Sequence, residues 1–133
     1  MNILLETQEA VFAALDGDAT LSGMINGIFD FVPQQTNFPY IMFGESSARE
    51  FSAKGTEGYS VNLKLNIFSD KKGREEVLQI MERLKSLLHE QSLTIAGFEH
   101  VSTYFTSANS ERDRSGKVYS GEIIFAIKAI TEE

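Results

Sequence analysis

Two histidines are the side chains best able to perform acid–base or metal chemistry in this sequence, which contains no cysteine. His89 closes a segment of helical periodicity, where a partly positive ring complements the helix dipole. His100 falls in an alternating segment, on the face opposite Val101. Zinc hydrolases carry two histidines four residues apart with a glutamate between them, and neither histidine here lies in such a pattern. We therefore predict no zinc site and no catalytic histidine.

Two aspartates around a glycine, Asp16 and Asp18, invite a calcium interpretation. An EF-hand loop counted from Asp16 requires glycine at its sixth position and glutamate at its twelfth. Leu21 and Gly27 occupy those positions, so the pattern fails. Helix capping explains the motif better, with Gly17 ending one helix and Asp18 starting a short helical turn. No metal site is predicted.

Basic residues in the stretch Lys71–Arg74 precede a long helix, whose N-terminus favours anions. They could mark an anion site, but a solvated turn capped by Asp70 and balanced by the two following glutamates explains them more simply. Gly44–Ala48 is half of a nucleophile elbow, because the second glycine is missing. We therefore expect no catalytic residue, no bound cofactor and no enzymatic activity.

Composition limits the class of protein further. The chain has 133 residues, 42% hydrophobic and 23% charged, which is typical of one globular domain spanning residues 1–133. Its net charge of −7 argues against a protein that grips nucleic acid, because such proteins concentrate positive charge. The N-terminus has no signal-peptide pattern and the longest apolar block, Ile123–Ile127, is too short to cross a bilayer. We expect a soluble protein without a membrane partner.

The clearest structural elements lie between Tyr59 and Glu90. Apolar and polar residues alternate from Tyr59 to Ile67, which predicts a strand with one buried face. From Arg74 the period becomes helical, with a single apolar stripe. The stripe consists of Val77, Ile80, Met81, Leu84, Leu87 and Leu88. Each element can bury its apolar face on the other, as in a two-layer domain.

Other segments complete this architecture. A first helix is predicted over Leu4–Leu15, with Leu4, Val11, Phe12 and Leu15 on its inner side. Strands are predicted at Ile28–Phe31, Pro39–Glu45, Phe98–Ser107 and Tyr119–Ile130. The prediction is an α+β fold: a two-layer domain with a mainly antiparallel, mixed β-sheet, and with the long helix and the N-terminal helix packed on one face.

Two hydrophilic segments interrupt the predicted sheet. Residues 46–58 are small and polar, and we interpret them as strand ends around a long mobile connection with Phe51 as its one apolar anchor. Residues 108–117 form a charged hairpin tip. Long loops of this kind are often functional or become ordered on binding.

Aromatic residues cluster in sequence at Phe29, Phe31, Phe38, Tyr40 and Phe43. Core packing explains most of them, and a subset is a candidate for lining a subunit interface.

The order of these features resembles the tail completion (head–tail joining, or tail terminator) family of tailed phages and gene transfer agents. The resemblance runs from about Glu9 to Ile130. It rests on the stretches Ala13–Leu21, Phe38–Glu45, Leu65–Glu76, and Leu87–His89 followed by Leu93–Gly97. One departure is Phe68, where the family pattern leads us to expect a tryptophan.

The resemblance implies a structural virion protein at the head–tail interface, made in the bacterial host cytoplasm. It would form a ring of six copies that caps the tail tube, joins it to the head connector, or does both. Its partners would be other copies of itself, the tail tube protein and the head connector protein. DNA would pass through without specific binding, and the resemblance implies no cofactor, metal or catalytic residue.

A cyclic ring needs two different patches on each protomer. We expect the two hydrophilic segments to supply one patch each. The candidate interface residues are Arg49, Glu50, Phe51, Lys54, Glu111, Arg112, Asp113, Arg114 and Lys117. The alternative is a small cellular α+β module that binds a ligand or peptide, which would need a concave pocket with convergent polar groups.

Overall fold

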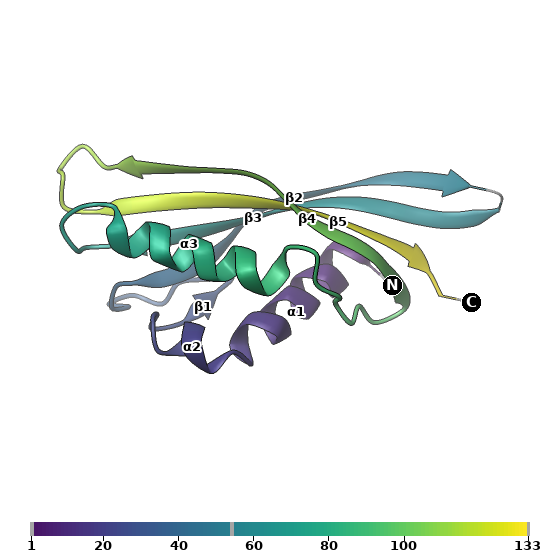
Figure 1. Ribbon diagram of the computed structural model, residues 1–133, viewed down its shortest axis with the longest axis horizontal. Helices are drawn as coiled ribbons and strands as arrows, with labels where there is room; N and C mark the ends of the chain where they lie inside the picture. Colours follow the sequence, from purple (N-terminus) through teal and green to yellow (C-terminus); the bar gives the residue numbers. More distant parts are fainter. Residues whose placement is uncertain (1, 54, 133) are drawn as a thin grey trace.

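The computed structural model describes residues 2–53 and 55–132, which fold into a twisted sheet with helices on one side (Figure 1). The elements in chain order are α1 (Ile3–Asp16), α2 (Ala19–Ser22), β1 (Ile28–Phe29), β2 (Tyr40–Ala53), β3 (Thr56–Ser69), α3 (Glu75–Leu88), β4 (Phe98–Arg112) and β5 (Tyr119–Thr131). The strand order is β1-β2-β3-β5-β4. Only the β1–β2 pair in this described part is parallel, so the sheet is mixed and mainly antiparallel. The predicted α+β class is confirmed.

The core lies between the sheet and the helices. Odd-numbered residues of β3 from Val61 to Ile67 are buried, and so are odd-numbered residues of β5 from Gly121 to Ala129. The predicted stripe of α3 packs against this face, with Val77, Ile80 and Leu84 fully buried. Tyr59 and Leu87 are only partly buried at the margin of the cluster. The strand-to-helix nucleus expected from periodicity is therefore present.

The first helix differs from its prediction in the position of one side chain. Val11 and Leu15 are fully buried as expected, but Phe12 is 39% exposed and faces away from the core. Thr7 and Ala10 take the inner positions instead. The buried side of α1 thus consists of Ile3, Thr7, Ala10, Val11 and Leu15, and the helix contacts β2, β3 and α3.

Residues 46–58 were predicted to be a long mobile connection, and this prediction is wrong. β2 continues to Ala53 and β3 begins at Thr56, with paired residues from Ser46 opposite Leu63 to Ala53 opposite Thr56. A register shift between Phe43 and Ser46 precedes this extension. Backbone pairing does not require an apolar face, so a strand of mostly small and polar residues forms without the alternation that identifies a half-buried strand.

The other predicted loop is also shorter than expected. β4 continues through residues 108–112, and Arg112 pairs with Tyr119, which leaves 113–118 as the tip. The predicted strand at Ile28–Phe31 is shorter too, because β1 ends at Phe29. The described chain therefore holds two long β-hairpins, β2–β3 and β4–β5, with much shorter connections than the sequence suggested.

Gly121 allows α3 to approach β5 closely. A Cβ atom placed on this glycine would lie 2.6 Å from Val77 Cγ1 and 2.8 Å from Met81 Sδ, both on α3. These distances are shorter than van der Waals contact, so a larger residue forces the Val77 and Met81 side chains or the helix itself to move.

We expect Gly121→Val to destabilise the protein by about 1–3 kcal/mol through overpacking of the α3–β5 contact. Urea unfolding followed by circular dichroism measures the change. Gly23→Ala is the matched control, because its Cβ would find its nearest atom at an ordinary 3.5 Å from the Thr20 carbonyl oxygen. An unchanged unfolding midpoint for Gly121→Val would contradict the close packing.

Candidate subunit interface

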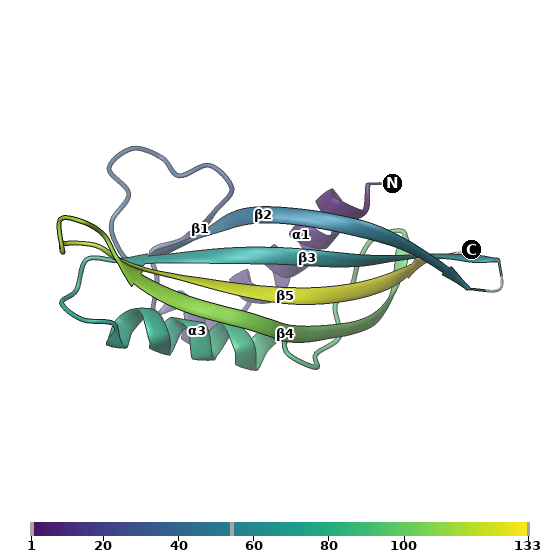
Figure 2. The same ribbon diagram turned by 90° about the horizontal axis from the view of Figure 1, so that it is seen from above.

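The two β-hairpins reach opposite ends of the molecule (Figures 1 and 2). We call them the β2–β3 arm, residues 46–53 and 56–63, and the β4–β5 arm, residues 107–124. The turn of the first arm lies at the end where both chain termini lie, and the tip of the second lies at the other end, beyond the start of α3. The structure therefore separates the predicted interface residues into two groups.

The β2–β3 arm displays its candidate residues on both faces of a hairpin ribbon, whose β3 strand is also paired with β5 as far as Gly58 opposite Ile130. Arg49 and Glu50 are exposed and pair with Ser60 and Tyr59. Successive side chains of a strand point to opposite faces, so Arg49 and Glu50 face opposite directions. The candidate Lys54 lies outside the described residues.

Phe51 packs across the same ribbon, as its predicted role as an anchor suggests. It lies opposite Gly58, where an added Cβ would approach the Phe51 ring to 2.6 Å. The ammonium of Lys128 lies 5.9 Å from the ring centroid, within the range of a cation–π contact. Phe51 is nevertheless 37% exposed, so part of its ring is available to a neighbour.

The β4–β5 arm ends in a charged, preorganised tip. Glu111 and Arg112 are the last residues of β4, and the exposed Asp113, Arg114 and Lys117 follow in the turn. This group brings two acidic and three basic side chains to one end of the molecule.

Asp113 holds this turn together. Its Oδ1 accepts hydrogen bonds from the Ser115 hydroxyl at 2.7 Å and from the Lys117 N–H at 3.2 Å. Its backbone N–H donates to the Val118 carbonyl at 2.9 Å, and Gly116 has the positive φ of 73° that the turn requires. The Ser115 hydroxyl and the backbone N–H groups of the turn hold the pKa of Asp113 below its usual value. The tip is thus ordered by its own hydrogen bonds.

Asp18 has the structural role predicted for it. Its carboxylate caps α2 by accepting from the Leu21 N–H at 2.8 Å. The same carboxylate receives two hydrogen bonds from the Arg83 guanidinium of α3, at 2.6 and 2.9 Å. The Arg83 hydrogen bond, with that from Leu21, lowers the pKa of Asp18. The carboxylate therefore joins two helices.

The two histidines are also engaged within the protomer. His89 is the residue after α3, and its Nδ1 accepts from the Phe105 N–H of β4 at 3.0 Å. His100 Nε2 lies 2.6 Å from the Thr103 hydroxyl, and burial lowers the pKa of this ring, so it is neutral at pH 7. Both histidines thus fix the edge of the sheet.

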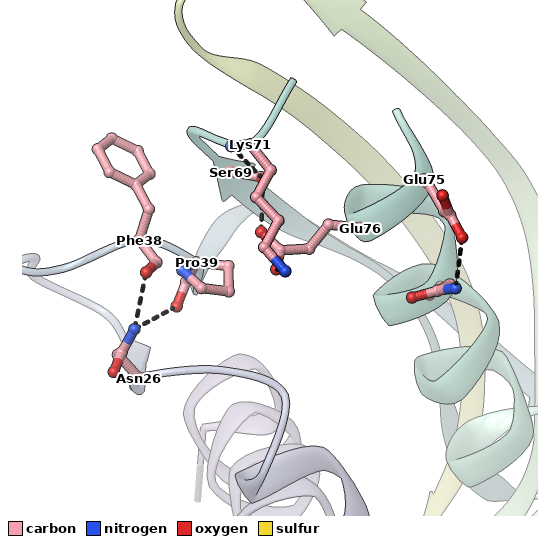
Figure 3. Close-up of polar contacts among 8 residues, drawn as sticks. Asn26, Phe38, Pro39, Ser69, Lys71, Glu75 and Glu76 are labelled. Carbon is pink, nitrogen blue, oxygen red and sulfur yellow. Dashed lines mark hydrogen bonds and ion pairs between the residues drawn. The ribbon is translucent and has the colours of Figure 1, made fainter. Parts of the chain in front are cut away.

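The basic residues before α3 are balanced, although not by the predicted cap. Among the described residues, the N-cap residue Arg74 makes no side-chain capping bond, and Asp70 does not take the N-cap position. Ser69 instead donates to Glu76 at 2.6 Å, and Lys71 pairs with Glu76 at 3.2 Å (Figure 3). Arg74 lies 5.9 Å from the ring centroid of Tyr119. These contacts tie the turn to the first turn of α3.

Surface depressions in the described part are shallow. Four of them have similar volumes of about 340–350 Å³, and none of these four is an enclosed cavity. No group of three or more acidic, histidine or cysteine residues that could hold a metal ion occurs among residues 2–53 and 55–132. Within the same residues, no helix has the length and apolar character needed to span a membrane.

Comparison with known proteins assigns the family. The model of the tail completion protein gp17 family matches residues 9–130, which is most of the chain. The chain belongs to this family. The resemblance drawn from its sequence motifs is thereby confirmed. No protein with a curated description matches the chain in sequence.

Solved structures agree with the family in fold. A chain of the virion of a native gene transfer agent particle is 17% identical, with a TM-score of 0.88, covering 96% of this chain and 97% of that chain. The gp17 protein of bacteriophage SPP1 is 21% identical, with a TM-score of 0.65, covering 98% of this chain and 92% of that chain. This chain is thus a phage tail completion protein by family and shares its fold with these two structures.

Several exposed apolar residues escaped the sequence analysis. Val101 and Tyr104 on β4 are 53% and 49% exposed, with the fully buried Thr103 between them. A period-2 prediction places Val101 and Thr103 on the same face, and the register shift between His100 and Ser102 breaks that alternation. Such a bulge has no distinct signal in a single sequence.

We expect Asp18→Asn to lower the urea midpoint at pH 7, because asparagine can still cap α2 but cannot form the ion pair with Arg83. The lowered pKa of Asp18 stabilises the fold above the unfolded-state pKa of about 3.9. This contribution is lost as the pH falls through the folded-state pKa. The difference between wild type and variant should therefore shrink from pH 7 to pH 3. Asp16→Asn, which replaces an exposed carboxylate, is the control. An equal loss of stability in both variants would contradict the role of the Asp18–Arg83 ion pair.

Proposed function

We propose that this protein is a structural virion component that forms a homo-oligomeric ring of six copies at the head–tail interface. The ring caps the tail tube, joins it to the head connector, or does both. The observation that carries this proposal is the match to the tail completion family over residues 9–130. The likeness in fold to a chain of a gene transfer agent virion supports a virion location.

The two arms supply the contact surfaces in this proposal. Residues 47–50 of β2 are exposed on both faces of the ribbon, and residues 111–117 are exposed at the other end of the molecule. The end of each arm extends past the pairing of β3 with β5, beyond the Gly58–Ile130 pair in one arm and beyond the Ser69–Tyr119 pair in the other. A two-stranded hairpin end is marginally stable in water by itself, so it gains from packing on a neighbour. Different patches at opposite ends are what a head-to-tail interface requires.

The charges of the arms suit specific contacts. Each arm presents acidic and basic residues together, Arg49 with Glu50 on one and Glu111 with Arg112 on the other. Ion pairs across an interface contribute orientation and partner choice more than raw affinity. The candidate partners are neighbouring copies, the tail tube protein and the head connector protein.

The overall charge suits a DNA passage. With a net charge of −7, the chain repels the phosphate backbone on balance. A ring of such subunits lets DNA pass without specific binding. Synthesis in the host cytoplasm is consistent with a chain that needs no disulfide, because it contains no cysteine.

Native mass spectrometry over a range of concentrations, with and without purified tail tubes, tests the ring. We expect a species of six copies, alone or assembled on tubes. A monomer at every concentration that also ignores tubes would overturn the proposal and favour a ligand-binding module.

Replacing residues 113–118 with an Asn-Gly turn should abolish assembly while leaving the protomer folded. Arg112 and Tyr119 are paired across the hairpin, so a two-residue turn closes it without distortion. The change removes Asp113, Arg114 and Lys117 together. Circular dichroism checks the fold, and native mass checks assembly.

Gly23→Ala, which alters a different part of the surface, should still assemble. Rings of the shortened protein that form at wild-type concentrations would show that the β4–β5 tip is not an interface.

A further inference from the structure

Phe31 is an aromatic residue that packing inside the protomer does not explain. It follows β1 in the connection to β2 and is 85% exposed. Of the other four residues in the aromatic cluster, Phe43 is buried in the core, and Phe29 and Phe38 stack against Tyr40. Exposing a whole phenyl ring to water is unfavourable, so a partner surface that covers it gains affinity.

The loop that carries Phe31 is braced at its base. Asn26 Nδ2 donates to the carbonyls of Phe38 and Pro39 at 2.9 and 3.4 Å (Figure 3). Within the loop, the Thr36 hydroxyl donates to the Pro33 carbonyl at 2.6 Å. A loop ordered before binding loses little conformational entropy when it docks.

A depression on the opposite edge of the sheet has exposed apolar residues and a fixed shape. We call it the β4 pocket; it has a volume of about 340 Å³ and is lined by residues 90–92 and 100–104. Val101 and Tyr104 are its exposed apolar residues. The Glu90 N–H donates to the Thr103 carbonyl at 2.7 Å and holds the turn after α3 against β4.

The β4 pocket can accept the Phe31 ring, because its mainly polar lining includes the exposed apolar side chains of Val101 and Tyr104. A cavity of about 150 Å³ can hold benzene, so the β4 pocket has room for a phenyl ring. Uncharged amides follow Phe31 in the same loop, at Gln34 and Gln35, and Gln91 and Ser92 are among the polar residues that line the pocket. An aromatic anchor inside a polar rim is the usual anatomy of an interface hot spot.

The Phe31 loop and the β4 pocket lie too far apart in one copy for Phe31 to enter the pocket of its own chain. The connection between β1 and β2, which carries Phe31, lies outside β2 at one edge of the sheet, whereas β4 is the strand at the far edge (Figure 2). Residues 100–104 of β4 line the β4 pocket. We propose that Phe31 of one copy inserts into the β4 pocket of the next copy. This inference rests on the proposed ring and adds the side-to-side contact between subunits. Because the two surfaces differ, the contact is heterologous and can be repeated from copy to copy.

The absence of cysteine allows a direct test by disulfide cross-linking. Asp30→Cys places a thiol beside Phe31, and Ser92→Cys places one on the pocket rim without changing size. The double variant should give a ladder of covalent multimers on a non-reducing gel after mild oxidation of assembled protein. Each single variant should give a dimer at most.

The matched control combines Asp30→Cys with Ser86→Cys, an exposed serine on α3 that lines a different depression. It should give no ladder. A ladder confined to the Ser92 variant supports the contact. Covalent dimers without higher species from the double variant would indicate a two-fold contact and overturn the heterologous arrangement.

Phe31→Ala should weaken assembly about tenfold or more, as loss of a hot-spot aromatic does. Leu78→Ala is the control, because Leu78 is 48% exposed on the outer side of α3. Native mass across concentrations measures both. If rings form normally, the double cysteine variant gives no ladder, and Phe31→Ala has no effect, then this contact is wrong and the proposed function still stands. If the wild type does not assemble under any condition, the proposed function itself is contradicted. The contact between copies is then contradicted as well.

Discussion

The close packing of α3 on β3 and β5 is the contact on which the rest of the structure depends. Val77, Ile80 and Leu84 cover the buried faces of both strands, and Gly121 lets the helix approach. This layer fixes the two central strands, and each of them is shared with one hairpin. The ends of the arms can therefore extend beyond the core with mostly polar residues, because their backbones are already held in register at the base.

The residues that suggest chemistry in the sequence are used to hold elements together. Asp18 and Arg83 join α2 to α3, and His89 joins the end of α3 to β4. The polar atoms of each of these side chains form contacts within the protomer. The arms, the Phe31 loop and the β4 pocket are the surfaces that we propose for partners. The proposed role in assembly would use such surfaces.

The candidate contacts divide naturally by position. The arms lie at the two ends of the sheet, and the Phe31 loop and the β4 pocket lie at its two edges. Ends and edges point in different directions, so the proposed side-to-side contacts between copies can coexist with the proposed contacts of the arms to other partners. In such an assembly the charged arms would set orientation, while the apolar contact at the edges would supply affinity.

The sequence by itself determined the α+β class, the half-buried strand β3, the stripe of α3 and the caps at Gly17 and Asp18, because each depends on neighbours within one or two turns of chain. The sequence identified which charged residues lie near the hairpin tips, but it did not determine how they are arranged in space. The extension of β2 through residues 46–53 depends on pairing with β3, and its polar sequence carries no period-2 signal. Tertiary structure alone decided that Phe31 is exposed while Phe29, Phe38 and Tyr40 stack, and that Val101 and Tyr104 share a pocket. Such outcomes depend on packing between distant segments, which local patterns do not encode.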